Sequence, residues 1–256
     1  MEDALCCIGR AARYAKWREH LQGRGGPQTE LVGTGALEPD SLLDENESKQ
    51  ALQEAGINVS SAQTCTWAAQ AVRVVRGLGY PVVLKAHGDG FEHKTELGAV
   101  ALDLRTDQAV QELAAKLLEL PGAKCVAVEP MITDTVAEII VGVSRDATLG
   151  LGLTIGTGGI LTEILADSVT LLLPVTREDI LDGLNGLRGA TFLDGYRGRP
   201  IGDTEVLADA IVAIAGYAES HADDLLEMDV NPILVRPRGS GVIAVDALIR
   251  RASVAR

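Results

Sequence analysis

Residues 85–100 read KAHGDGFEHKTELGAV, and this stretch carries the main signal for the fold. Lys85 closes an apolar run that starts at Tyr80, which is the pattern of a buried strand that ends in a cation. A Gly-rich segment then carries His93, and a second apolar run begins at Val100. A buried strand that delivers a lysine, followed by a loop with a histidine, indicates phosphate chemistry.

The composition narrows the class of protein. A chain of 256 residues suits one large domain or two smaller lobes. Its net charge of -13 disfavours nonspecific binding to nucleic acid or to an anionic membrane, since both require a basic surface. No run of about 18 uncharged apolar residues occurs, so we expect no membrane span, and the charged N-terminus does not read as a signal peptide. The cysteines form no CxxC pair, which favours reduced thiols in the cytoplasm: Cys6, Cys7, Cys65 and Cys125.

The order of apolar and Gly/Pro-rich segments predicts an α/β protein in four parts. We expect an N-terminal helix over residues 1–22, a flexible linker over 23–40, a first lobe over 41–122 and a second lobe over 123–256. The second lobe is the richer in expected strands. Its first two, at residues 123–130 and 135–144, are expected to form a hairpin around Thr133 and Asp134.

The last hairpin of the chain carries a possible metal site. Asp229 and Asn231 lie two residues apart on an expected strand, so their side chains share a face. If the chain turns at Arg238 and Gly239, Asn231 lies opposite Asp246. Two carboxylates and an amide oxygen are the ligands that Mg²⁺ prefers. The same residues fit equally well a strand end and a turn with no metal.

Three charged residues sit at strand ends where they can face a cleft. Lys85 can reach phosphate oxygens from its buried strand, or it can extend to solvent from a sheet edge. Glu129 and Glu138 flank the expected hairpin of the second lobe, and Glu138 precedes the apolar run from Ile139 to Val143. Both glutamates also fit solvated strand ends.

The turn GTGG at residues 156–159 and the loop histidine are weaker signals. The turn matches neither a Walker loop nor G-x-G-x-x-G, so it reads either as a simple hairpin turn or as backbone amides that face a phosphate. A neutral imidazole can carry a phosphoryl group, although His93 by itself also fits an ordinary surface histidine.

Five segments occur in one order along residues 41–250: ENESKQALQEAGINV (45–59), LGYPVVLKAHGDGFEHKTELGAVAL (78–102), EPMITDTVAEIIVGVSRD (129–146), IGTGGILTEILAD (155–167), and EMDVNPILV with VIAVDALI (227–235, 242–249). Together they resemble the nucleotide-binding (β) part of the NDP-forming acyl-CoA synthetases, which include ADP-forming acetate–CoA ligase. These enzymes are relatives of succinyl-CoA synthetase and have an ATP-grasp fold. The resemblance implies two lobes with a nucleotide between them.

The resemblance also implies a role for each matched residue. Lys85 matches a lysine that binds the ATP phosphates, and Glu138 matches a glutamate of the nucleotide site. The hinge around adenine corresponds to Glu129, Pro130 and Met131. Asn231 and Asp246 match Mg²⁺ ligands, with Asp229 close by. His93 matches the loop histidine that relays phosphate between two sites, and Gly88, Gly90 and Gly98 would give its loop the freedom to travel.

What the family does defines the expected activity and partners. Its members interconvert acid, CoA and ATP with acyl-CoA, ADP and phosphate through a phosphohistidine. Residues 2–20 resemble the end of the CoA-ligase part in fused members. CoA is therefore expected on a separate α subunit, in an α2β2-type assembly that acts on a small carboxylic acid. Departures from the family pattern occur at Glu96, Ala99 and Thr157, and none removes a charged site residue.

Two other functions remain open from the sequence. One is a self-sufficient ATP-grasp ligase that joins a carboxylate to an amine or a thiol through an acyl phosphate. The other is a nucleotide-binding regulatory subunit without turnover. The sequence leaves ATP and GTP equally possible, and it does not identify the acid.

Overall fold

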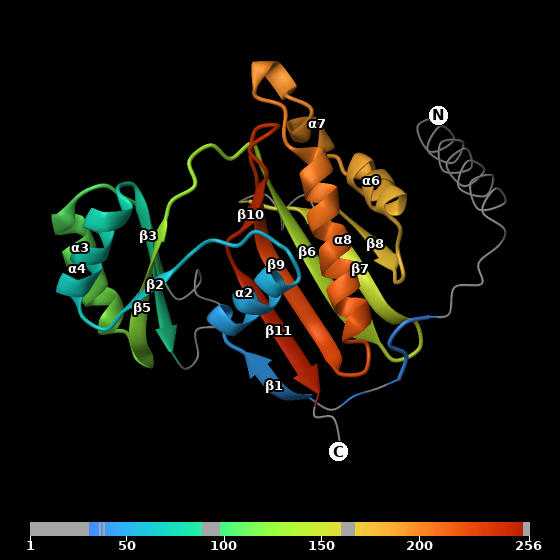
Figure 1. Cartoon of the computed structure of the whole chain (residues 1–256), viewed down its shortest axis with the longest axis horizontal. Helices are drawn as coiled ribbons and strands as arrows, with labels where there is room; N and C mark the ends of the chain where they lie inside the picture. The colour runs from blue at the N-terminus through green and yellow to red at the C-terminus, as the bar shows by residue number, and fades with distance from the viewer. Residues whose placement is uncertain (1–30, 36, 38, 89–97, 160–166, 253–256) are drawn as a thin grey trace, which may run out of the picture.

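The computed structural model describes residues 31–35, 37, 39–88, 98–159 and 167–252. Their strands form two separate sheets, one of four strands and one of seven (Figure 1). The expected N-terminal helix over residues 1–22, His93 with most of its loop, and residues 160–166 after the GTGG turn lie outside the described residues. The expected linker over residues 23–40 is described only from residue 31, and its last two residues already belong to a strand.

The smaller sheet is antiparallel and has the order β2 (Gln63–Cys65), β5 (Ala123–Pro130), β3 (Val82–Gly88) and β4 (Val100–Leu104). Helices α3 (Ala68–Leu78) and α4 (Asp107–Leu118) pack on one face of it (Figure 1). Val82, Leu84 and Ala86 join their core, so the alternation of a strand turns Lys85 to the opposite face. Lys85 therefore lies on the face of this sheet opposite α3 and α4.

The larger sheet has the order β1 (Pro39–Leu43), β11 (Ala247–Ala252), β9 (Leu225–Val235), β6 (Ala137–Asp146), β7 (Gly150–Thr157) and β8 (Ser168–Leu172), with β10 (Val242–Ala244) paired to β9. Helices α2 (Glu45–Glu54) and α8 (Thr204–Ser220) lie on the same face of it (Figure 1). Shorter helical segments follow β8: α6 (Arg177–Gly186), α7 (Ala190–Leu193) and η1 (Tyr196–Gly198).

Local sequence explains where the helices begin and which side they bury. Asp44 caps α2 in a capping box with Glu47, and Thr106 caps α4 by accepting a hydrogen bond from the amide of Ala109. On α8 the buried residues recur at helical spacing, so one stripe of that helix packs on the sheet. None of the described helices is both long enough and apolar enough to span a membrane.

The expected lobe boundary after residue 122 is wrong. Strand β5 begins at Ala123, yet it pairs with β2 and β3 inside the smaller sheet. The predicted boundary puts helix α2 in the first lobe, but α2 packs on β11 and β1 of the larger sheet. The smaller sheet with its helices is thus an insertion between α2 and β6, and the chain crosses between the sheets twice, after α2 and after β5.

The expected hairpin between residues 123–130 and 135–144 is also wrong. Both segments are strands, but β5 pairs in the smaller sheet and β6 pairs with β7 and β9 in the larger one. Four consecutive residues of β5, residues 126–129, are buried, which requires neighbours on both edges and both faces. Residues 131–136 therefore connect two sheets rather than two strands of one sheet.

The larger core gives a direct test of this fold. Leu153 is fully buried on β7, whereas Leu149, four residues earlier, is 49% exposed. We expect Leu153→Ala to lower the free energy of unfolding by about 2–5 kcal/mol, because it removes buried methyl groups and leaves a cavity. The matched Leu149→Ala change should cost less than about 0.5 kcal/mol. Urea unfolding of both variants measures the difference, and equal losses would contradict the placement of β7.

Candidate functional site

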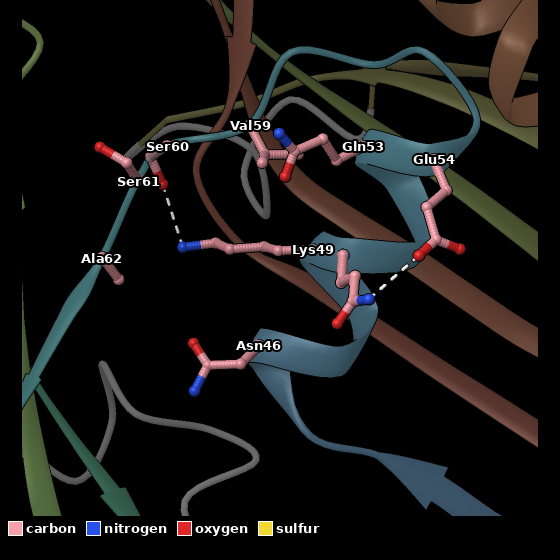
Figure 2. Close-up of a pocket in the computed structure, with 9 residues that line it drawn as sticks. Asn46, Lys49, Gln53, Glu54, Val59, Ser60, Ser61 and Ala62 are labelled. Carbon is pink, nitrogen blue, oxygen red and sulfur yellow. Dashed lines mark hydrogen bonds between the residues drawn. The ribbon is translucent and has the colours of Figure 1, made fainter.

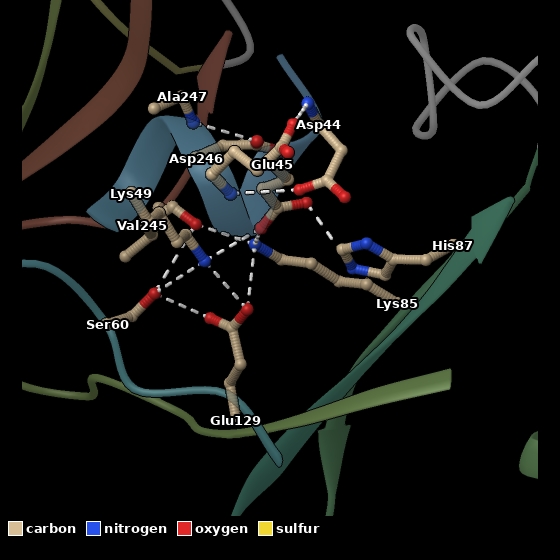
Figure 3. A network of polar contacts seen from close by, with 11 residues as sticks. Asp44, Glu45, Lys49, Ser60, Lys85, His87, Glu129, Val245, Asp246 and Ala247 are labelled. Carbon is tan, nitrogen blue, oxygen red and sulfur yellow. Dashed lines mark hydrogen bonds and ion pairs between the residues drawn. The ribbon is translucent and has the colours of Figure 1, made fainter. Parts of the chain in front are cut away.

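Four buried charged side chains meet where the two sheets approach each other (Figure 3). The Lys85 Nζ atom lies 3.0 Å from Glu45 Oε1 and 3.3 Å from Glu129 Oε1. The Lys49 Nζ atom lies 2.7 Å from the same Glu45 oxygen and 2.9 Å from the same Glu129 oxygen. Each of these side chains is at most 8% exposed. We call this group the interlobe ion cluster.

The register of the smaller sheet explains why two of its members meet. Lys85 pairs with Ala127, and Glu129 pairs with Val83, so Lys85 and Glu129 are diagonal neighbours on one face. That face points away from α3 and α4, as the alternation along β3 requires. The other two members come from the larger lobe, because Glu45 and Lys49 lie one turn apart on α2.

Hydrogen bonds extend the cluster to the closing strands of the chain. Lys85 Nζ donates to the carbonyl oxygen of Val245 at 2.6 Å, next to Asp246. Ser60 accepts from Lys49 at 3.0 Å and donates to Glu129 Oε2 at 2.7 Å. Lys85 thus contacts residues of both lobes. Its ammonium group binds the carbonyl group of the residue that precedes Asp246, a proposed metal ligand.

The electrostatics of the cluster follow from burial and pairing. Burial, followed by the charge of Lys85, lowers the pKa of Lys49 from 10.5 to about 8, against the opposing effect of Glu129. Burial by itself raises the pKa of Glu129, but the charges of Lys85 and Lys49 and two hydrogen bonds hold it below the ordinary value. Burial also lowers the pKa of His87, whose Nε2 atom lies 3.5 Å from Glu45. The cluster therefore pairs two glutamate side chains with two lysine side chains at contact distance.

The closing strands pair in the register that the sequence predicts. The Asn231 amide donates to the carbonyl oxygen of Asp246 at 3.2 Å, so these two residues lie opposite each other. The pairs on either side, β10 with β9 and β11 with β9, keep the same register. The buried carboxylate of Asp203 fixes the turn, because it accepts hydrogen bonds from the amides of Gly239 and Gly241.

The donor set of this strand pair fits a hard divalent cation. Burial raises the pKa of Asp229, the nearby charges of Glu227 and Asp246 raise it further, and a hydrogen bond with Asn231 opposes them. A carboxylate in this condition is one that a bound cation would stabilise. Within the described part of the chain, no three His, Cys, Asp or Glu side chains gather at metal-binding distance, so the candidate set rests on two carboxylates and one amide oxygen.

The other expected site residues are Glu129, Pro130, Met131 and Glu138, and they do not all belong to the interlobe ion cluster. Glu129 belongs to it, whereas Pro130 ends β5 and the amide of Met131 donates to the carbonyl oxygen of Pro81 at 3.0 Å. Glu138 is exposed near the start of β6, where its carbonyl oxygen accepts from the Gly158 amide at 2.7 Å. The structure thus joins Lys85 and Glu129 directly, and it places Glu138 beside the GTGG turn.

The loop that carries His93 is bounded by two described glycines that differ in their surroundings. A side chain on Gly88 would collide with the carbonyl oxygen of Gly122, so this glycine permits a close approach of two backbones. Nothing lies within 4 Å of the position that a Cβ atom would take on Gly98. Of the glycines expected to free the loop, Gly88 has this packing role, Gly98 stands in open space, and Gly90 lies with His93 outside the described residues.

Sequence reasoning missed Glu45, Lys49, Ser60 and His87. The spacing of Glu45 and Lys49 is visible in the sequence, but it normally marks an exposed helical pair rather than a buried one. A pocket of about 580 Å³ lies beside α2 and is lined by Lys49 and Ser60 together with Asn46, Gln53 and Ser61 (Figure 2). Only the tertiary fold brings these residues to the junction of the lobes.

Comparison with known proteins identifies the family of the chain. A family model described as an ATP-grasp domain matches residues 36–250. The chain belongs to the ATP-grasp family. This confirms the predicted fold class and the resemblance on which it rested.

The relatives include ADP-forming ligases from archaea. The chain is 34% identical over 208 residues to acetate–CoA ligase [ADP-forming] II of Archaeoglobus fulgidus, which covers 81% of this chain and 30% of that protein. It is 28% identical over 216 residues to the beta subunit of acetate–CoA ligase [ADP-forming] II of Pyrococcus furiosus, which covers 82% of this chain and 91% of that subunit. The chain thus spans about a third of the first relative and most of the second.

A solved structure has a similar backbone. It is a dinucleotide-forming acetyl-coenzyme A synthetase 1 of Ca. Korarchaeum cryptofilum in complex with coenzyme A and Mg-AMPPCP, with a phosphohistidine segment pointing towards the nucleotide binding site. Its TM-score with this chain is 0.68 at 28% identity, and the match covers 81% of this chain and 92% of that one.

The pairing of Glu129 predicts how stability depends on pH. Its pKa is held below the ordinary value of 4.5, so its stabilising contribution is present above about pH 4.5 and is lost as the pH falls through the folded pKa. We expect Glu129→Gln to lower the free energy of unfolding by about 3 kcal/mol near pH 7, because it leaves buried lysines with one carboxylate fewer. The difference should shrink on acidification, as urea unfolding at a series of pH values measures.

A matched control is Glu119→Gln, which changes an exposed glutamate at the end of α4. Its effect should stay within about 0.5 kcal/mol at every pH. A difference between wild type and Glu129→Gln that persists unchanged in acid would show that packing, rather than the carboxylate charge, accounts for the loss.

Proposed function

We propose that this chain is the nucleotide-binding subunit of an ADP-forming acyl-CoA synthetase. In the overall reaction, acid, CoA and ATP interconvert with acyl-CoA, ADP and phosphate. The single observation that carries the proposal is the place of Lys85, whose ammonium group lies at the junction of two ATP-grasp lobes beside the Asn231 and Asp246 strand pair. The names of the archaeal relatives supply the reaction.

Each lobe contributes to the proposed nucleotide site. Lys85 donates to phosphate oxygens from the smaller sheet, because its ammonium group is a compact point charge on a flexible stem. The adenine ring lies against the connection between the lobes that starts at Glu129, Pro130 and Met131. Glu138 closes the site from the larger sheet, next to the Gly158 amide.

Asp229, Asn231 and Asp246 are the groups that would hold Mg²⁺. Their oxygen donors fit this ion, and a cation would stabilise the charged form of Asp229, whose pKa is raised by burial and by the nearby charges of Glu227 and Asp246. A bound Mg²⁺ would offset negative charge on the phosphates during transfer. The protein itself would hold the phosphate near Lys85, and closure of its two lobes would exclude water from the site.

His93 is the proposed carrier of the phosphoryl group. An imidazole nitrogen attacks the γ-phosphorus of ATP, the bond from that phosphorus to the β–γ bridging oxygen breaks, and ADP leaves with the bond electrons. The imidazole loses its proton to solvent. The phosphohistidine then delivers its phosphoryl group to the site where CoA and the acid react.

That second site is proposed to lie on a separate CoA-binding α subunit, in an α2β2-type assembly with a small carboxylic acid as the acyl donor. The beta-subunit relative, of which this chain covers 91%, supports the division into subunits. A cytoplasmic location suits the free thiols of Cys65 and Cys125.

The relay is tested by co-purifying the chain with a CoA-binding partner and measuring CoA-dependent ATP cleavage over a panel of carboxylic acids. We expect His93→Ala to reduce turnover by at least about 10³-fold, because the covalent carrier is lost. His221→Ala is the control, since His221 stacks on Tyr217 at the end of α8 and should leave turnover unchanged.

Two results would contradict this function. Full turnover in His93→Ala would remove the relay. Acid-dependent ATP hydrolysis by the chain alone, unaffected by CoA, would identify a self-sufficient ligase instead.

The GTGG turn provides an independent test of the Glu138 role. A Cβ atom on Gly158 would lie 2.9 Å from the Glu138 Cβ atom, so Gly158→Ala must displace the backbone of β6 at that residue. We expect this variant to bind Mg-ATP about tenfold more weakly in titration calorimetry. Gly186→Ala is the matched control, because nothing lies within 4 Å of its Cβ position. Equal affinities in the two variants would place the nucleotide away from Glu138.

A further inference from the structure

The interlobe ion cluster contains one more cation than the proposed nucleotide chemistry uses. Lys85 is assigned to the phosphates, whereas Lys49 has no part in that chemistry. Both lysines contact the same two carboxylate oxygens, Glu45 Oε1 and Glu129 Oε1 (Figure 3). The four side chains balance as two positive and two negative charges.

The ammonium group of Lys49 lies closer to both carboxylates than that of Lys85 does, whereas Lys85 also donates to the carbonyl oxygen of Val245. The Lys49 Nζ atom is closer to Glu45 than that of Lys85, at 2.7 Å against 3.0 Å. It is also closer to Glu129, at 2.9 Å against 3.3 Å. Ser60 fixes it further, because the hydroxyl accepts from Lys49 and donates to Glu129. Of these contacts, the one with Ser60 is not shared with Lys85.

Transfer of Lys85 to a phosphate has an electrostatic cost that depends on Lys49. If Lys85 were the only cation between two buried carboxylates, its departure would leave both uncompensated, which is strongly unfavourable in a buried site. It would also leave an excess negative charge beside the incoming phosphates. With Lys49 in place, both carboxylates keep a cation at hydrogen-bond distance.

We propose that Lys49 is a positioning residue for nucleotide binding, which keeps Glu45 and Glu129 paired so that Lys85 is free to bind the phosphates. This inference rests on the proposed nucleotide function of the same cluster. Lys49 acts through Lys85 and touches no nucleotide itself. Besides the two glutamates, the charged groups that act on Lys49 are Lys85 and Asp246. The pKa of His87 is lowered by burial, by the charge of Lys85 and also by the charge of Lys49.

The pocket in Figure 2 is consistent with separate roles for Lys85, which binds the phosphates, and Lys49, which pairs with the carboxylates. Lys49 lines the pocket from α2 and Ser60 lines it from the extended segment across from that helix, whereas Lys85 enters the cluster from β3. Burial and the charge of Lys85 lower the pKa of Lys49 to about 8, so its ammonium group is charged at neutral pH and responds to the charges around it. Removing the negative charge of Glu45 should therefore compensate for the loss of the positive charge of Lys49.

The test is titration calorimetry of Mg-ADP into the full chain. We expect Lys49→Met to weaken binding about tenfold, because Lys85 must then neutralise two carboxylates alone. The double variant Glu45→Gln/Lys49→Met removes one charge of each sign, and its affinity should return to within about threefold of wild type. Lys116→Met is the matched control, since Lys116 is exposed on α4 and should leave the affinity unchanged.

The outcomes separate this inference from the function on which it rests. No binding of Mg-ADP by wild type would overturn the nucleotide function, and the inference with it. Wild-type affinity in Lys49→Met, with normal binding by wild type, would overturn only the inference. A double variant as weak as Lys49→Met would show that Lys49 acts through packing rather than charge, and would also overturn it.

A single variant covers the case in which Lys49→Met does not fold. Glu45→Gln leaves both lysines with one carboxylate fewer, so the proposal predicts Mg-ADP binding at least as tight as in wild type. Binding about tenfold weaker than wild type would contradict it. Far-UV circular dichroism and thermal unfolding of each variant establish that the folded protein is being measured.

Discussion

The pairing of the Lys85 ammonium group with Glu45 and Glu129 is the constraint on which the rest of the structure depends. A lysine at a strand position that is 6% exposed is tolerated only when carboxylates accompany it. One of these, Glu129, comes from the neighbouring strand, and the other, Glu45, comes from the opposite lobe. The charge of Lys85 thus links the smaller sheet to a helix of the larger lobe.

This constraint gives a reason for the unusual place of α2 in the chain. The helix precedes the smaller sheet in sequence but packs on the larger one, with Leu52 fully buried in that core. Its first turns then face the smaller sheet, where Glu45 and Lys49 complete the ion cluster. Because the smaller lobe is inserted between α2 and β6, both connections between the lobes pass beside the site, near Ser60 and after Pro130.

The same arrangement suits a site that opens and closes. Buried ion pairs contribute little net stability when they form, because desolvation offsets most of the attraction. They therefore fix how the two lobes are oriented. Replacing one carboxylate partner of a lysine by a phosphate costs little free energy, provided that every charge keeps an opposite charge beside it. A phosphate that enters the cluster takes the place of carboxylate oxygens around Lys85, with Lys49 remaining between Glu45 and Glu129.

Part of this account was predictable from the sequence, and the rest depends on tertiary structure. The apolar run from Tyr80 located the strand that carries Lys85, because a short continuous apolar run is typical of a strand that is buried on both faces. The turn at Arg238 and Gly239 fixed the register of Asn231 and Asp246, because a short turn sets pairing locally.

The errors have a common physical cause. A strand pattern does not specify which strand it pairs with, so residues 123–130 were assigned to the wrong sheet and to a hairpin with 135–144. Glu45 and Lys49 were overlooked because a Glu–Lys pair on a polar helix face is usually exposed, and only the docking of the smaller lobe buries it.

A crystal structure of the chain with Mg²⁺ and a non-hydrolysable ATP analogue tests the central claim most directly. We predict Lys85 Nζ at hydrogen-bond distance from a phosphate oxygen, Mg²⁺ bound by Asn231 and Asp246, and Lys49 still between Glu45 and Glu129. The account would be contradicted by a structure in which the nucleotide lies elsewhere and Lys85 keeps both of its carboxylate partners.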